Sequence, residues 1–225
     1  MDRYDIPLSL TGIVFGVPLA AWIVLAVVLM CLALIVVRRK SDTREISMIT
    51  ILVAACLASN YALIWLPNVK LMDLIVFVSG LQFGMYVGCL VGILVWAVYG
   101  SINPYGFILP IWVGCMLSES LFGVTGGLIG KCTRITSGSP KVFAWEMAVT
   151  GFILSFIYDV VTNLLSAVTI SWFETTHLTV LAVMVSGIPF ALIHEISNGI
   201  LFFLGVGPLN LSIQRIVGVR SHVSR

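Results

Sequence analysis

Two carboxyl side chains lie deep inside long apolar stretches of the chain. Asp159 falls within the stretch from Phe143 to Ile170, and Glu119 within the stretch from Ile108 to Gly130. A charge is costly in such surroundings, so carboxyl groups found there usually bind a ligand, a proton or a partner on a neighbouring helix. Asp159 and Glu119 are therefore the first candidates for chemistry.

Polar residues around Asp159 recur every three or four positions, which places them on one face of a helix. Asp159 lies about 24 Å along that helix from Phe143, and Asn163 follows one turn later. Substrate contact and hydrogen bonding between helices are the two interpretations of this polar stripe. Its members are Ser155, Asp159, Thr162, Asn163 and Ser166.

One helix face carries Trp112, Cys115 and Glu119, because Cys115 follows the tryptophan by three residues and Glu119 follows it by seven. Trp112 lies near the outer end of this helix, and Glu119 near its middle. Glu119 either pairs with a cationic or hydrogen-bonding ligand or is a protonated carboxyl that bridges two helices.

Lys70 and Asp73 carry opposite charges. They are three residues apart at the start of a helix, close enough to pair. A helix N-terminus also favours the negative charge of Asp73, so we expect a structural role for it and assign Lys70 to a ligand carboxylate or phosphate. His194-Glu195 resembles the start of a HExxH zinc motif, but Asn198 stands where the second histidine belongs.

His194 and Glu195 lie about 25 Å from the outer end of their helix, toward the cytoplasm. This depth predicts that the pair is far from an outward pocket. We therefore expect a satisfied internal hydrogen-bond network there, not catalysis. The five cysteines form no CxxC or Cys/His cluster, which favours free thiols, and we expect neither a metal nor a cofactor.

Composition identifies the class of protein. Sixty per cent of the 225 residues are apolar, a tenth are charged, and the mean hydropathy is +1.11. These values exclude an ordinary water-soluble domain, and no basic face for nucleic acid is present. Uncharged runs of about 20 residues predict an all-α integral membrane protein.

The glycine-rich segment from Met72 to Ile102 decides the topology. As one helix its 31 residues would be about 46 Å long, too long for one untilted span. As a hairpin turning near Phe83 to Tyr86, it places ten of the twelve lysines and arginines inside and only Arg3 and Lys70 outside. A single crossing would put eight of them outside, so the positive-inside rule selects the hairpin.

This topology predicts seven membrane segments. Residues 1–40 hold an extra N-terminal helix, Pro18 to Val37, whose N-terminus lies outside. Residues 41–210 form a six-helix core whose second and third helices are short, and residues 211–225 are a basic cytoplasmic tail. The first core helix spans Ile46 to Leu66.

Three outer loops, at residues 67–71, 100–107 and 171–177, are rich in aromatic and polar side chains. They form either an aromatic belt at the membrane interface or the lid of an outward pocket. A flat heterocycle, such as a vitamin or nucleobase-like molecule, suits such a pocket. The candidate substrate-binding residues are Asn68, Lys70, Tyr99, Asn103, Tyr105, Trp112, Glu119, Asp159, Asn163, Trp172 and His177.

Three alanines, Ala54, Ala58 and Ala62, form a smooth stripe on the first core helix. Such a stripe permits close packing of another helix. It serves either packing within this chain or docking of a second protein.

Four blocks of residues accompany this stripe over roughly residues 44 to 210: Asn68 to Asp73, continuing through Gly80 and Phe83-Gly84; Tyr99 to Gly106; Tyr158-Asp159 with Asn163; and His194 to Asn198. Together they resemble the substrate-binding S component of energy-coupling factor (ECF) vitamin transporters. The helix that ends at Arg38-Arg39-Lys40 is an addition to the usual six.

The resemblance implies a subunit without catalytic activity in a prokaryotic plasma membrane. It would capture a nutrient outside and dock through Ala54, Ala58 and Ala62 on a transmembrane coupling protein, the T component, driven by two ATP-binding-cassette ATPases. The chain itself has no nucleotide-binding signature. The alternative is a stand-alone proton-coupled carrier or a small intramembrane enzyme that uses Glu119, Asp159 and Glu195.

Overall fold

The computed structural model describes residues 13–14, 17–18, 43–102, 108–132, 139–173 and 177–217. Two-residue strands β1 (Ile13–Val14) and β2 (Val17–Pro18) pair antiparallel. The remaining elements are helices: α2 (Thr43–Ala62), α3 (Leu71–Phe83), α4 (Met85–Ile102), α5 (Leu109–Lys131), α6 (Pro140–Phe173) and α7 (His177–Val217). Apart from Pro18 in β2, the expected N-terminal helix lies outside the described residues.

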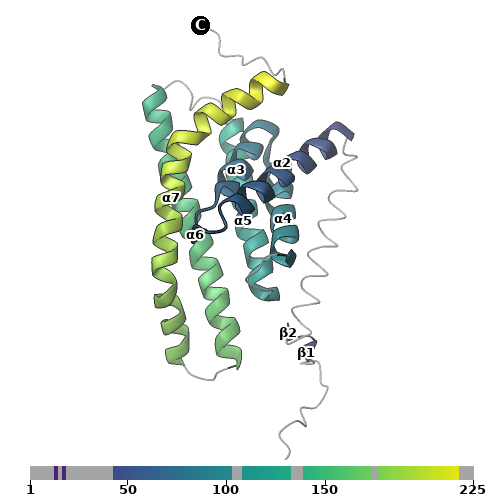
Figure 1. Ribbon diagram of the computed structural model, residues 1–225. Helices are drawn as coiled ribbons and strands as arrows, with labels where there is room; N and C mark the ends of the chain where they lie inside the picture. Colours follow the sequence, from purple (N-terminus) through teal and green to yellow (C-terminus); the bar gives the residue numbers. More distant parts are fainter. Residues whose placement is uncertain are drawn as a thin grey trace, which may run out of the picture.

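The helical class predicted from composition is confirmed for the described part of the chain (Figure 1). Five helices, all except α3, are long and apolar enough to cross a membrane. The chain is therefore compatible with a multi-pass membrane protein. The third core helix, α4, has 18 residues and is longer than expected, whereas α3 has only 13.

The long glycine-rich segment is broken at Gly84, as the charge distribution predicted. Gly84 has a φ of +92°, a conformation that favours glycine, and its N–H donates to the Gly80 carbonyl oxygen over 2.8 Å. Gly84 therefore forms the turn between α3 and α4 and is not part of their packing face.

The other glycines of the segment bring α3 and α4 into backbone contact with α5. A Cβ added to Gly80 would overlap the carbonyl oxygen of Gly123, and one added to Gly88 would lie 2.6 Å from the same oxygen and from the Gly80 Cα. A Cβ on Gly92 would lie 2.9 Å from the backbone of Glu119. The three helices thus form one tightly packed unit.

Helices α6 and α7 run side by side as a second unit (Figure 1). They have 34 and 41 residues and extend beyond the apolar runs that predicted them. The expected loop from Ser171 to His177 is helical at both ends, because α6 continues to Phe173 and α7 begins at His177. Asp159 and His194 consequently lie at similar distances from the connection between the two helices.

Helix α2 contacts α3 and α4 through a face on which Ile49, Cys56 and Asn60 are buried. The three stripe alanines are exposed on other faces of α2. Among the described residues, no other helix covers this face of α2. Packing within this chain and docking of a second protein therefore both stay predictions.

Candidate ligand-binding site

A cavity of about 470 Å³ lies where the α2–α3 connection meets α4, α5, α6 and α7. This volume is within the usual range for small-molecule sites. Five of the predicted substrate-binding residues line it: Asn68, Lys70, Tyr99, Asp159 and Asn163. The structure thus gathers the connection between α2 and α3, the end of α4 and the polar stripe of α6 around one space.

Aromatic rings form one wall of the cavity. The Lys70 ammonium lies 4.3 Å from the ring centroid of Tyr158 and 5.3 Å from that of Trp96, within cation–π range. Trp96 also packs edge-on against Tyr99, with 5.4 Å between ring centroids. The expected direct pair between Lys70 and Asp73 is wrong, because Asp73 bonds to other residues and Lys70 rests over the rings.

Below this wall, five buried side chains from α3, α6 and α7 form a hydrogen-bonded network, here called the polar cluster. His194 lies 2.6 Å through Nε2 from Asp73 Oδ2 and 2.9 Å through Nδ1 from Asp159 Oδ2. The Asn198 amide is 2.6 Å from both Asp73 Oδ2 and the Ser155 hydroxyl. The polar cluster therefore fastens α3 to both helices of the second unit.

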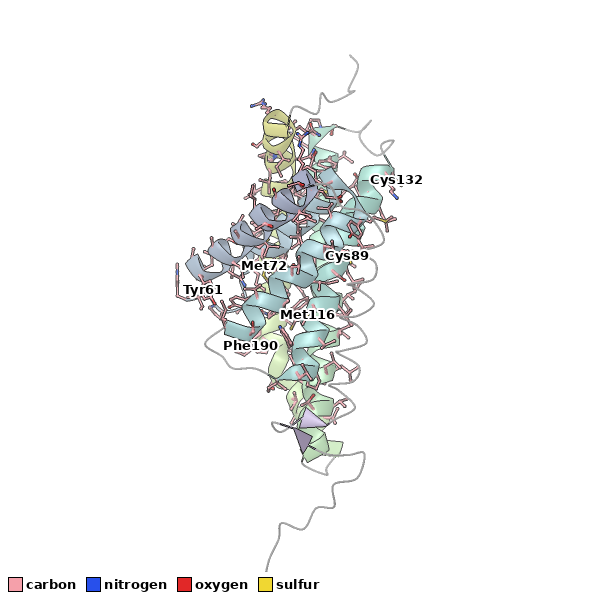
Figure 2. All side chains as sticks on the ribbon, turned by 90° about the vertical axis from the view of Figure 1, so that its right-hand side faces the viewer. Tyr61, Met72, Cys89, Met116, Cys132 and Phe190 are labelled. Carbon is pink, nitrogen blue, oxygen red and sulfur yellow. The ribbon has the colours of Figure 1, made fainter. Side chains whose placement is uncertain are left out.

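The expectation of an internal network at His194 is confirmed by these hydrogen bonds. Its expected distance from the pocket is wrong, because His194 bonds directly to Asp159, which lines the cavity. The prediction counted depth along α7 alone. Helix α6 runs beside α7 and brings Asp159 to the same level as His194. Figure 2 shows Phe190, another lining residue, below Met72, toward the end at which α6 joins α7.

Glu119 and Trp112 do not line the cavity. Glu119 is fully buried, and its Oε2 accepts a hydrogen bond of 3.3 Å from the Trp96 indole. The Trp112 indole donates to the Trp96 carbonyl oxygen over 2.5 Å. Of the two interpretations of Glu119, the bridge between helices fits and direct ligand contact does not. Both residues therefore hydrogen-bond to Trp96, which itself lines the cavity.

Two lining asparagines are fixed by α7. The Asn68 amide donates to the Phe190 carbonyl oxygen over 2.8 Å, and Asn68 has a positive φ of 56°. Asn163 packs against Gly187, where an added Cβ would lie 2.7 Å from its amide. Any larger residue at position 187 would therefore displace the Asn163 side chain.

Four predicted site residues stay predictions. Asn103 and Tyr105 lie outside the described residues, and Trp172 and His177 are placed at helix ends without a description of their side chains.

Several lining residues were not among the predicted substrate-binding residues, chief among them Trp96, Tyr158, Asn60 and Cys115. Trp96 lies three residues before Tyr99, so helical spacing was a usable signal for it. Tyr158 precedes Asp159 and lines the cavity beside it. Which face of α6 meets the cavity depends on how this helix packs against its neighbours, and no local pattern reveals that.

The chain matches no family model, no curated protein and no solved structure in three comparisons. The site is therefore interpreted from its own geometry: a cavity among apolar helices, walled by aromatic rings, with one lysine, the Asp159 carboxyl group and a stripe of amides and hydroxyls.

Proposed function

We propose that this chain is the substrate-capture subunit of an ECF-type importer. The observation that carries the proposal is the cavity of about 470 Å³ bounded by Trp96, Tyr158, Lys70 and the polar stripe of α6. It combines an aromatic wall with convergent polar groups, the usual composition of a small-molecule site.

The ligand class follows from the groups that face the cavity. Trp96, Tyr99 and Tyr158 suit stacking on a flat ring. The Thr162 and Ser166 hydroxyls donate to carbonyl oxygens of their own helix, so they offer a ligand only acceptor lone pairs. The Lys70 ammonium and the asparagine amides supply donors. A heteroaromatic molecule of vitamin or nucleobase size, with both donors and acceptors on its rim, satisfies this set.

The alanine stripe supports the transport part of the proposal. Ala54, Ala58 and Ala62 are exposed, and their small side chains let another helix approach closely. We assign this surface to a T component that is driven by two ATP-binding-cassette ATPases. The corresponding location is a prokaryotic plasma membrane, with the cavity toward the outside and the C-terminus in the cytoplasm.

The test separates docking from ligand binding. Ala54→Trp and Ala58→Trp are expected to abolish co-purification with the T component and uptake, and to leave ligand affinity unchanged. Ala182→Trp, at an exposed alanine of α7, is the matched control and is expected to keep all three. Uptake that persists in cells lacking any T component would refute the ECF mechanism and favour a stand-alone carrier.

A further inference from the structure

Two fully buried carboxyl groups, Asp73 on α3 and Glu119 on α5, lie within hydrogen-bonding reach of each other. Within the described residues, Asp73 Oδ1 and Glu119 Oε1 have no hydrogen-bond partner. Two ionised carboxylates so close together in a region of low polarity would repel each other strongly. A contact of this kind is stable when a proton or a cation lies between the two groups.

The other oxygen of each carboxyl group is already occupied. Asp73 Oδ2 accepts hydrogen bonds from His194 and Asn198, and Glu119 Oε2 accepts one from Trp96. One carboxylic O–H between the two groups would supply the hydrogen bond that their remaining oxygens lack.

The proton count of the polar cluster points to the same arrangement. Each of the two nitrogen–oxygen contacts of His194, to Asp73 and to Asp159, needs one proton, wherever that proton resides. The histidine and the two aspartates then carry a net charge of −1 together. Lys70, over the rings of Trp96 and Tyr158, supplies the balancing positive charge. An ionised Glu119 would add a negative charge that these four groups do not balance.

A metal cation fits this place less well than a proton. Among the described residues, no three His, Cys, Asp or Glu side chains are arranged to hold a metal ion. His194, bonded to both aspartates, and Lys70, close by, would also repel a further cation.

We propose that Asp73 and Glu119 form a buried proton site, in which Glu119 carries the proton and donates it to Asp73. The site does not depend on what occupies the cavity. It is nevertheless connected to the cavity at both ends, because the hydrogen-bonded chain runs from Asp159 through His194, Asp73 and Glu119 to Trp96. Both end residues line the cavity, so ligand contacts there act on the residues that hold the proton.

Infrared spectroscopy of the full chain in lipid vesicles tests the site directly. The wild-type protein is expected to show the C=O stretching band of a protonated carboxylic acid, shifted in D2O. Glu119→Gln removes this band, and the control Glu146→Gln, at an exposed carboxyl of α6, retains it. A band that survives in Glu119→Gln, or is missing from the wild-type protein, overturns the proposal.

Thermal unfolding gives a second readout that also detects a bound cation. A glutamine at position 119 keeps both the donor to Asp73 and the acceptor for Trp96, so we expect its Tm to change by less than about 2 °C. Replacing choline chloride by sodium or potassium chloride at equal ionic strength should leave the wild-type Tm unchanged. A large loss of stability in Glu119→Gln, together with a Tm that rises with one of these cations, would show a cation site instead.

Discussion

The α3–α4–α5 unit and the α6–α7 hairpin are packed in opposite ways. In the first unit, a Cβ added to Gly123 would overlap the backbone of Gly88, and one added to Gly126 would overlap the backbone of Phe77. In the second, Gly151 faces the ring of Phe202, and a Cβ on Gly199 would lie 3.8 Å from its nearest neighbour. One unit is held by backbone contact, the other by side chains.

Because of this difference, we expect the two walls of the cavity to differ in how easily their atoms rearrange. Backbone atoms in contact cannot rearrange without moving whole helices, whereas side chains change rotamer. We therefore interpret α3–α5 as the fixed wall, which carries Trp96 and Tyr99, and α6–α7 as the adaptable one, which carries Tyr158 and the polar stripe. The polar cluster joins them beneath the cavity.

Removing the bond between the two units is expected to have the largest effect. His194→Ala leaves Asp73 and Asp159 buried without their shared partner. Loss of one member of a buried charged pair costs about 3–5 kcal/mol. Thermal unfolding in detergent should show this loss, and the double variant His194→Ala with Asp159→Asn should recover part of it. A change below about 1 kcal/mol would show that the polar cluster does not hold the units together.

A methyl group in the fixed wall should cost slightly less. Gly123→Ala forces α4 and α5 apart, because the new Cβ overlaps the backbone of Gly88. Overpacking of this kind costs about 3 kcal/mol where the neighbour cannot move. The same unfolding measurement checks it. Normal stability of this variant would mean that α3–α5 adjusts as readily as α6–α7.

Lys70 belongs to the junction between the two units and should affect binding more than folding. Lys70→Met keeps an apolar chain over the rings and loses the charge, so we expect ligand affinity to fall about 10-fold, or about 1.4 kcal/mol. Lys141→Met, at an exposed lysine of α6, is the control and should bind normally. Equal affinities in the two variants would remove Lys70 from the site.

The smallest effect is expected in the adaptable unit. Gly199→Ala places its methyl group in ordinary contact distance on α7 and improves helix propensity. Its stability should rise by up to about 1 kcal/mol. Gly123→Ala makes the same chemical change. The difference in stability between the two variants therefore measures how much space the surrounding atoms leave for the new methyl group. A large destabilisation here would erase the contrast between the units.

The helices were predictable from sequence because each depends on local hydropathy and on the distribution of lysine and arginine. The break at Gly84 was found in this way. The polar cluster was not, although Asp73, Asp159 and His194 each attracted attention separately. Their meeting depends on the rotation and relative height of α3, α6 and α7, which local periodicity does not determine. Counting depth along α7 alone therefore placed His194 away from the cavity.

Glu119 illustrates the same limit on the other side of the cavity. Its helix face was correct, and Cys115 on that face does line the cavity. Trp96 lines the cavity where Glu119 does not, and its indole N–H donates to Glu119 Oε2. No spacing within α5 reveals that a tryptophan of α4 lies between the carboxyl group and the cavity.

Native mass spectrometry of the gently solubilised protein tests the central claim, that this cavity binds one small molecule. Ser166 lines the cavity on α6, and Ser166→Phe adds a ring that takes up part of its volume, whereas Ser186→Phe alters an exposed serine of α7 and is the control. We predict one small heteroaromatic molecule per chain in the wild-type protein and the control, and none in Ser166→Phe. Retention of the same molecule at the same occupancy in Ser166→Phe would contradict the account.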